Sequence, residues 1–296
     1  MTYNADMRIA ITADLHWGHG ERGSRAALAL RDFLLAHPPD LLLLGGDQGT
    51  ADNFNGCLDL FANLSCPKAL VPGNHDIWVE DGDARGDSLH VYNSHLPAVC
   101  KEHGFHYLDH GPLVRVDAGL AIVGSINWYD YSWSLDKLKA ATPDWDYRLR
   151  TMQFTRGRHN DRRFVQWPLD DVGFTRRVVG AFAQHLETAL AQAEHALVLT
   201  HHPAFYGLNF PRDTDGPLSL DALLWDAFSG NRDMEDLLTR HAERIAAAFC
   251  GHTHRQRENH LGPIAGYNIG GDYHFKRLLL YGWPGGAVEA HVFGQS

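Results

Sequence analysis

Five short apolar runs in this sequence each lead directly into residues that bind metal ions or form tight turns. The runs cover residues 9–12, 41–44, 69–72, 196–200 and 246–250. In open α/β sheets, ligand sites lie just beyond the carboxyl ends of the strands. If each run forms a strand, five strands deliver carboxylate, amide and imidazole side chains to a common edge. This arrangement constrains the fold more than any other feature of the chain.

The polar residues that follow the runs are typical metal ligands. They are Asp14 and His16, Asp47, Asn74 with His75 and Asp76, His201 with His202, and His252 with His254. Imidazole suits iron, zinc and manganese-like ions, and carboxylate or amide oxygens suit the harder ones. Asp14 and His16 flank Leu15, so in an extended segment both side chains would point to one side. Because the chain has 20 histidines, no single pair is diagnostic, but the ordered set predicts a metal centre.

The alternation of short apolar runs with longer helical stretches predicts an α/β fold with much parallel pairing. We expect strands at residues 8–12, 41–44, 69–71, 113–116, 120–123, 196–200, 245–249, 264–269 and 287–293. We expect helices at residues 22–36, 54–63, 87–103, 175–193 and 234–244. The late strands resemble hairpins, which indicates a mixed sheet. The first six residues are interpreted as a tail before the first strand.

One region, residues 128–171, departs from this rhythm and is interpreted as an insertion in a single domain spanning residues 1–296. It holds seven Trp and Tyr residues, and residues 148–163 carry six arginines against one acid, Asp161. One interpretation is a cap over the metal site, in which Arg156 and Arg158 bind an anionic substrate. The alternative is a small satellite core whose arginines pair with surface carboxylates.

The overall charge excludes some functions. A net charge of −10 and a pI of about 6.0 disfavour binding of nucleic acid through the overall field, so any phosphate must be attracted locally. The four cysteines show no paired motif, which is typical of a reducing compartment. The chain starts without an apolar signal core and has no apolar run long enough to span a bilayer. We therefore expect a cytoplasmic protein with no membrane partner.

The ordered set of motifs resembles the calcineurin-like metallophosphoesterase superfamily over most of the chain. The resemblance is carried by Asp14-x-His16, Gly46-Asp47, Gly73-Asn74-His75-Asp76, His201-x-Pro203 and Gly251-His252-x-His254. It implies a four-layer αββα sandwich, in which two mixed β-sheets pack face to face with helices outside. It also implies hydrolysis of a small-molecule phosphomonoester or phosphodiester by in-line attack of a hydroxide that bridges two metal ions.

The resemblance further implies how the metals are held. Asp14, His16, Asp47 and His254 would hold one ion, and Asp47 would bridge to a second ion held by Asn74, His201 and His252. The ions would be Mn²⁺, Fe²⁺ or Fe³⁺, or Zn²⁺. His201 is preferred over His202 because the family places a proline two residues after the ligand.

His75 is the candidate general acid. The sequence departs from the family pattern at the position of the Asp that commonly supports this histidine. The family often has a second Asp three residues after the bridging Asp, where it supports the general-acid histidine, but this chain has Thr50 there. Asp52 or Asp76 could substitute. Asp76 and His202 are also candidates to orient metal ligands from behind.

Two other functions compete with a small-molecule hydrolase. Some relatives with this fold have lost ligands and serve as interaction modules, although every ligand position is filled here. A nuclease would need a groove for a polyanion, which the acidic balance disfavours.

Overall fold

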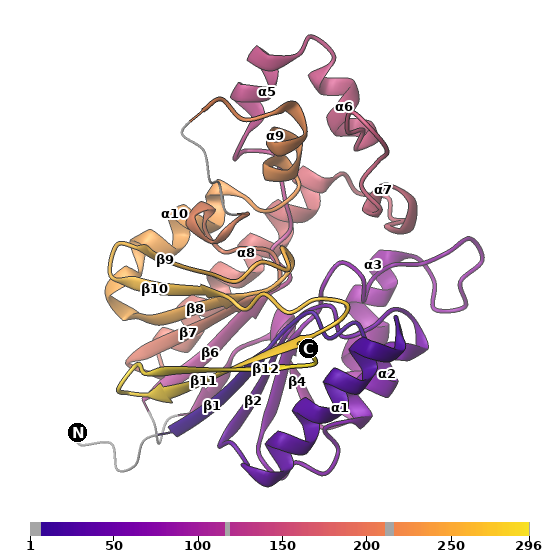
Figure 1. The fold of residues 1–296 in the computed structure, drawn as a ribbon. Coiled ribbons are helices and arrows are strands. Elements are labelled where there is room, and N and C mark those ends of the chain that lie inside the picture. Colours follow the sequence, from indigo (N-terminus) through magenta and orange to yellow (C-terminus); the bar gives the residue numbers. More distant parts are fainter. Residues whose placement is uncertain (1–6, 116–118, 211–215, 296) are drawn as a thin grey trace.

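The computed structural model describes residues 7–115, 119–210 and 216–295 and contains two six-stranded mixed sheets (Figure 1). The first sheet has the strand order β12-β11-β1-β2-β3-β4. Its strands are β1 (Met7–Thr12), β2 (Leu41–Gly45), β3 (Lys68–Val71), β4 (Phe105–Tyr107), β11 (Lys276–Trp283) and β12 (Val288–Phe293). Strands β1 to β4 pair in parallel. Strand β11 pairs with β1, and β12 pairs with β11, both in antiparallel fashion.

The second sheet has the strand order β5-β6-β7-β8-β10-β9. Its strands are β5 (Leu113–Arg115), β6 (Leu120–Ser125), β7 (His195–Thr200), β8 (Ile245–Cys250), β9 (Arg257–Leu261) and β10 (Ile264–Asn268). Strands β6, β7, β8 and β10 are parallel, and an antiparallel strand closes each edge. In both sheets, the parallel centre directs several carboxyl ends to the same side, where a site can form.

The helices lie outside the sheets and in a lobe at one end (Figure 1). The longer ones are α1 (Glu21–Ala36), α2 (Asp52–Asp59), α4 (Leu96–Glu102), α8 (Asp171–Leu190) and α10 (Arg232–Arg240). The turn α3 (Ser88–His90) and a π-helical turn (Val91–His95) run into α4, and single 3-10 turns occupy Leu108–His110, Tyr206–Leu208 and Ala242–Arg244. The lobe contains α5 (Leu135–Ala141), α6 (Trp145–Thr151), α7 (Asp161–Phe164) and α9 (Leu220–Ala227).

The strand alternation explains the layers. In β2, Leu41 and Leu43 belong to the core between the two sheets, whereas Leu42 and Leu44 belong to the core under the helices. All four are fully buried. A strand that is buried on both faces reads as a continuous apolar run, as this one does. Two apolar faces per sheet therefore fit the four-layer sandwich that the family resemblance implied.

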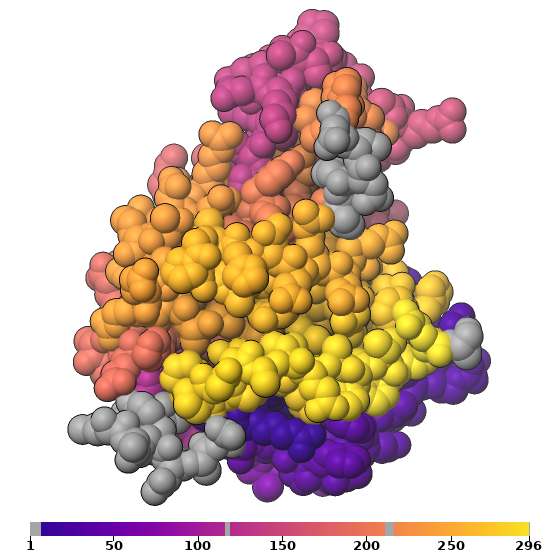
Figure 2. All heavy atoms as spheres, turned by 60° about the vertical axis from the view of Figure 1, so that its left-hand side comes forward, coloured from indigo at the N-terminus to yellow at the C-terminus, as the bar shows by residue number. Residues whose placement is uncertain are grey.

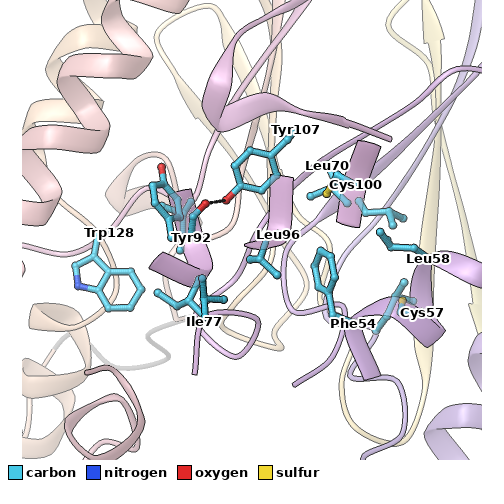
Figure 3. Close-up of a cluster of buried hydrophobic side chains, with 14 of the residues drawn as sticks. Phe54, Cys57, Leu58, Leu70, Ile77, Tyr92, Leu96, Cys100, Tyr107 and Trp128 are labelled. Carbon is cyan, nitrogen blue, oxygen red and sulfur yellow. Dashed lines mark hydrogen bonds between the residues drawn. The ribbon is translucent and has the colours of Figure 1, made fainter. Parts of the chain in front are cut away.

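The helical lobe has a core that is continuous with the main body. Trp128 and Tyr129 are fully buried in the same cluster as Phe54 and Ile77 of the main body. Figure 3 shows Trp128 beside Ile77 and Tyr92, and the Tyr107 hydroxyl donates to the backbone carbonyl of Tyr92 at 3.0 Å. The lobe is thus packed against the sheets and is not a separate globule.

The two sheets also meet along their last strands. In the space-filling view, the yellow strands β11 and β12 lie directly beside the orange strands β9 and β10 (Figure 2). Arg257 and Tyr267 of one sheet share a pocket with Arg277 and Val288 of the other. In the described ranges, no helix is both long and apolar enough to cross a bilayer.

Most predicted elements are present, with some differences. Strands β4, β9 and β11 were not predicted, and α5, α6 and α7 replace a segment expected to be rich in loops. The segment 128–171 has no regular strand, as expected. Helix α8 starts earlier than predicted because the Asp170 side chain caps it, accepting a hydrogen bond from the backbone N–H of Gly173. The predicted tail and the end of the strand at Val116 fall outside the described residues.

Candidate metal centre

Strands β1, β2, β3, β7 and β8 end at one edge, and their following loops bring all seven predicted ligands together. Asp14, His16, Asp47 and His254 form one group in which the candidate ligand atoms lie within 4.8 Å of one another. His201, His202 and His252 form a second group, and Asn74 contacts His201. The sequence therefore predicted correctly which strand ends meet.

The backbone at this edge adopts a conformation that the sequence argument did not anticipate. Asp14, His16, Asp47, His252 and His254 have φ angles of 56°, 40°, 56°, 70° and 53°. These values lie in the left-handed region, so the prediction of an extended segment is wrong. Asp and His are among the residues that tolerate this region best. Strained backbone of this kind clusters at functional sites.

Two glycines allow the loops to approach one another. A Cβ at Gly73 would lie 2.1 Å from Oδ1 of Asp47, and a Cβ at Gly251 would lie 2.6 Å from Oδ2 of Asp14. Real Cβ atoms essentially never make contacts below 3.0 Å. Both carboxylates are therefore held against backbone that has no side chain.

The first group places electron-rich atoms close together. Nε2 of His16 lies 3.0 Å from Nε2 of His254 and 3.5 Å from Oδ2 of Asp47. Nε2 of His254 is 3.6 Å from Oδ1 of Asp14. Asp14 is fully buried, and its Oδ2 has no hydrogen-bond donor among the described residues. A buried carboxylate oxygen without a donor is costly unless a cation binds it.

Lone pairs also converge around His201, where a hydrogen bond fixes the position of the ring proton. Nδ1 of His201 lies 3.1 Å from the carbonyl oxygen of Gly45, and a carbonyl can only accept, so Nδ1 carries the proton. Nε2 of His201 is then a bare lone pair. It faces Oδ1 of Asn74 at 3.0 Å and Oδ1 of Asp47 at 3.4 Å. Three acceptors that converge without a proton between them fit a metal ion.

Burial shifts the pKa values of these groups so that their neutral forms are favoured. It lowers the pKa of His201 to about 3 and that of His254 to about 4, and it raises the pKa of Asp14 to about 7. Burial disfavours every ionised form, so the imidazoles stay neutral and lack the positive charge that would balance the carboxylates. Both groups therefore fit a two-metal site.

His202 is the third member of the second group, although the sequence did not favour it as a ligand. Its Nδ1 is 3.1 Å from the carbonyl oxygen of Ile126, and its ring lies over that of His252, with centroids 4.0 Å apart. Its Nε2 is buried and has no hydrogen-bond partner in the described ranges. His201, rather than His202, faces Asp47 and Asn74, in line with the sequence-based preference.

The Asp76 carboxylate accepts hydrogen bonds from the backbone. Its two oxygens accept hydrogen bonds from the N–H groups of Gly49 at 2.9 Å and Gly73 at 2.7 Å. Burial raises the pKa of Asp76 to about 7, and these N–H groups oppose the rise. Asp76 thus ties the loop after β2 to the loop after β3. Within the described part of the chain, no hydrogen bond or ion pair joins it, or Asp52, to the ring of His75.

His75 borders the cavity above the two groups. Its Nε2 lies 3.5 Å from the Tyr273 hydroxyl and 3.9 Å from Oδ2 of Asp47. The ring stacks on Trp78, with centroids 3.6 Å apart. Burial lowers the pKa of His75 well below its usual value. The ring is therefore fixed in place and neutral in the metal-free site.

The cavity has a volume of about 320 Å³, and residues of the lobe line it opposite the predicted ligands. Phe154, Arg158 and His159 come from the segment 128–171. Phe210 and Trp225 come from the second excursion, after β7, which the sequence analysis did not associate with the site. The lobe therefore faces the predicted ligands from two segments that are distant in sequence.

The six arginines of residues 148–163 have different environments. Arg148 pairs with Asp144 at 2.9 Å, and Arg150 pairs with Asp146, as the satellite-core alternative predicted. Arg158 lines the cavity, and its Nε donates to Oε1 of Gln153 at 3.0 Å. Arg156 is exposed at the turn just before it and is not among the residues that line the cavity.

A centre of this kind on two packed mixed sheets is that of a metal-dependent phosphoesterase. The chain belongs to the calcineurin-like phosphoesterase family, whose profile matches residues 7–256. The resemblance noted in the sequence is thereby confirmed.

Individual relatives are distant. The [acyl-carrier-protein] phosphodiesterase PptH of Mycobacterium tuberculosis is 27% identical over 135 residues, which cover 45% of this chain and 40% of that protein. The crystal structure of that phosphopantetheinyl hydrolase superposes with a TM-score of 0.68 at 20% identity, covering 91% of each chain. A dimetal phosphatase from Danio rerio superposes with a TM-score of 0.57 at 13% identity, covering 98% of this chain and 99% of that one. At these identities, the superpositions show a shared fold.

Proposed function

We propose that this chain is a hydrolase that uses two metal ions to cleave a phosphoester bond in a small anionic molecule. The observation that carries this proposal is the convergence of the lone pairs of His201, Asn74 and Asp47 without a proton between them. Family membership supports the same reaction class. Mn²⁺, Fe²⁺ or Fe³⁺, and Zn²⁺ all suit this mixture of imidazole and oxygen ligands.

The seven predicted residues would hold the ions. Asp14, His16 and His254 would hold one ion, Asn74, His201 and His252 would hold the other, and Asp47 would be shared between them. When bound, the ions supply water activation and charge neutralisation at the phosphoryl oxygens. They also provide the local positive charge that a protein with a net charge of −10 otherwise lacks.

His75 assists the departure of the leaving oxygen. It lines the cavity beside Asn74, and stacking on Trp78 holds its ring in place. A neutral imidazole can donate an N–H to the leaving oxygen, and the negative charge of a bound phosphate raises its pKa towards protonation. Tyr273 steadies Nε2 from the other side.

The lobe selects the substrate. Arg158 places a guanidinium at the cavity, and Phe154 and Trp225 offer aromatic surface opposite the metals. An anionic group and a planar or apolar group therefore fit together in a cavity of about 320 Å³. A nucleotide-like molecule has both features, and so does a phosphopantetheinyl ester of the kind named for the mycobacterial relative.

A binding scaffold and a nuclease are less well supported. The complete set of predicted ligands favours a working centre over a scaffold. Two segments of the lobe line the cavity, and the net charge of −10 disfavours binding of a polyanion. The cysteines are all free thiols, which supports the expected cytoplasmic location.

The test combines metal analysis with a panel of substrates. The purified protein is stripped with a chelator, and hydrolysis of a nitrophenyl monoester, a nitrophenyl diester, nucleotides, phosphopantetheinylated carrier protein and single-stranded DNA is measured with and without Mn²⁺. Activity should disappear on stripping and return with the metal, and Asp47→Asn should abolish most of it without loss of the fold. A fully active metal-free sample would refute the proposal.

A further inference from the structure

We infer that Asp161, a residue of the lobe, is the positioning residue that orients Asn74 for metal binding. The inference rests on the proposed function, in which Asn74 is a metal ligand. Asp161 lies at the start of α7 and is 1% exposed. The sequence analysis counted it only as the one acid among the arginines of the segment.

The Asp161 carboxylate is the meeting point of three donors from different parts of the fold. Its Oδ1 accepts from Nδ2 of Asn74 at 2.8 Å and from the indole N–H of Trp78 at 2.7 Å. Its Oδ2 accepts from the Tyr129 hydroxyl at 3.0 Å. Hydrogen bonds to a charged, buried acceptor are stronger than neutral ones.

The chemistry of a carboxylate decides which way the Asn74 amide faces. An amide offers an NH₂ on one side and an oxygen on the other, and rotation by 180° exchanges them. Oδ1 of Asp161 accepts from the Trp78 indole N–H and offers Asn74 an acceptor, so the NH₂ of Asn74 faces Asp161. The amide oxygen is then forced towards Nε2 of His201, where the second metal ion would bind.

Without this contact, the amide would rotate. Nε2 of His201 is a lone pair, and it repels the Asn74 oxygen at 3.0 Å when no cation lies between them. The Asn74 amide would then turn its NH₂ towards His201 and lose its place as a ligand. Asp161 prevents that rotation, and so the lobe completes the metal centre in addition to covering it.

The first experiment measures Mn²⁺ binding to the chelator-stripped, full-length protein by calorimetry. We expect the wild type to bind two ions. Asp161→Ala should weaken one of the two by about 10- to 100-fold, the usual effect of losing a partner behind a metal ligand, and leave the other unchanged. Asp161→Asn should stay within a few-fold of the wild type, because its oxygen still accepts from Asn74 and Trp78 while its NH₂ faces the Tyr129 oxygen.

A double-mutant cycle tests whether Asp161 acts through Asn74. If it does, Asp161→Ala combined with Asn74→Ala should lose no more Mn²⁺ affinity than Asn74→Ala alone. The matched control is Asp171→Ala. Asp171 is a partly buried carboxylate at the start of α8 that accepts from two aromatic side chains, Trp128 and Tyr131, and within the described part of the chain no hydrogen bond or ion pair joins it to a predicted ligand. It should lower Tm but bind both ions as the wild type does.

The outcomes separate the inference from the proposed function. A wild type that binds no Mn²⁺ overturns both. A wild type that binds two ions overturns only the inference if Asp161→Ala binds them equally well, or if Asp171→Ala loses as much affinity. A loss in Asp161→Asn as large as in Asp161→Ala also overturns it, because charge and not orientation would then be the cause.

Discussion

Replacement of Gly73 by alanine tests whether close backbone approach sets the position of the Asp47 carboxylate. The new Cβ would lie 2.1 Å from Oδ1 and 2.4 Å from the backbone nitrogen of Asp47. Rotation of the Asp47 side chain can relieve the first contact but not the second. Gly73 does not have a positive φ, so the substitution acts through this contact and not through backbone strain.

The size of the effect follows from the displacement. To restore a separation of 3.0 Å, the carboxylate must retreat by roughly 1 Å, a misplacement that costs about 100-fold in rate at a preorganised site. We therefore expect kcat/KM for a nitrophenyl diester to fall about 100-fold, which corresponds to about 2.7 kcal/mol of transition-state stabilisation.

Gly180→Ala is the matched control. Gly180 lies exposed in the interior of α8, with no atom within 4 Å of the added Cβ. Alanine there should raise the free energy of unfolding by about 0.5–1 kcal/mol and leave kcat/KM unchanged. If Gly73→Ala keeps the kcat/KM and Mn²⁺ affinity of the wild type, the loop does not hold Asp47 as we describe.

Four other substitutions give three separate predictions. His75→Ala should lower kcat about 10²–10⁴-fold for poor leaving groups and less for nitrophenol, and an equal loss for both would contradict the acid role. Arg158→Ala should raise KM for the natural substrate but not for a small chromogenic ester, whereas Arg156→Ala should change little, since Arg156 does not line the cavity. Burial raises the pKa of Asp109 to about 7, so between about pH 4 and pH 7 the native state binds a proton that the unfolded chain has released. The free energy of unfolding therefore falls as pH rises from about 4 to 7. Asp109→Asn should flatten that part of the profile of Tm against pH.

The sequence predicted the α/β alternation and the ligand edge because both follow from simple patterns, whereas the four-layer sandwich was implied by the family resemblance. Leu41 to Leu44 form a run that is apolar on both faces, and such a run needs a layer on each side. Strand β4 was not predicted because an alternation of apolar and polar residues cannot be recognised over only three residues. Strand β11 was not predicted because Lys276 opens the strand, although the structure buries that lysine against the carbonyl oxygen of Asp14.

Two parts of the site could not be predicted from local pattern. Trp225 lies 54 residues after the end of the segment 128–171, and no periodicity indicates that the two excursions share a cavity. Asp161 looked like a surface counter-ion because its neighbours are arginines, and only the fold shows that its oxygens face Asn74, Trp78 and Tyr129. Contacts between segments distant in sequence decide both cases.

The left-handed backbone at the strand ends limits how this centre can be altered by mutation. Asp14, His16, Asp47, His252 and His254 each occupy a conformation that most side chains adopt at a cost of roughly 1–2 kcal/mol. A substitution intended to change the metal preference must therefore introduce a residue that tolerates a positive φ and also offers a suitable ligand atom. Asn and Asp meet both demands, whereas Cys and Glu would add strain to the new ligand set. The accessible variants of this centre are consequently fewer than coordination chemistry alone would allow.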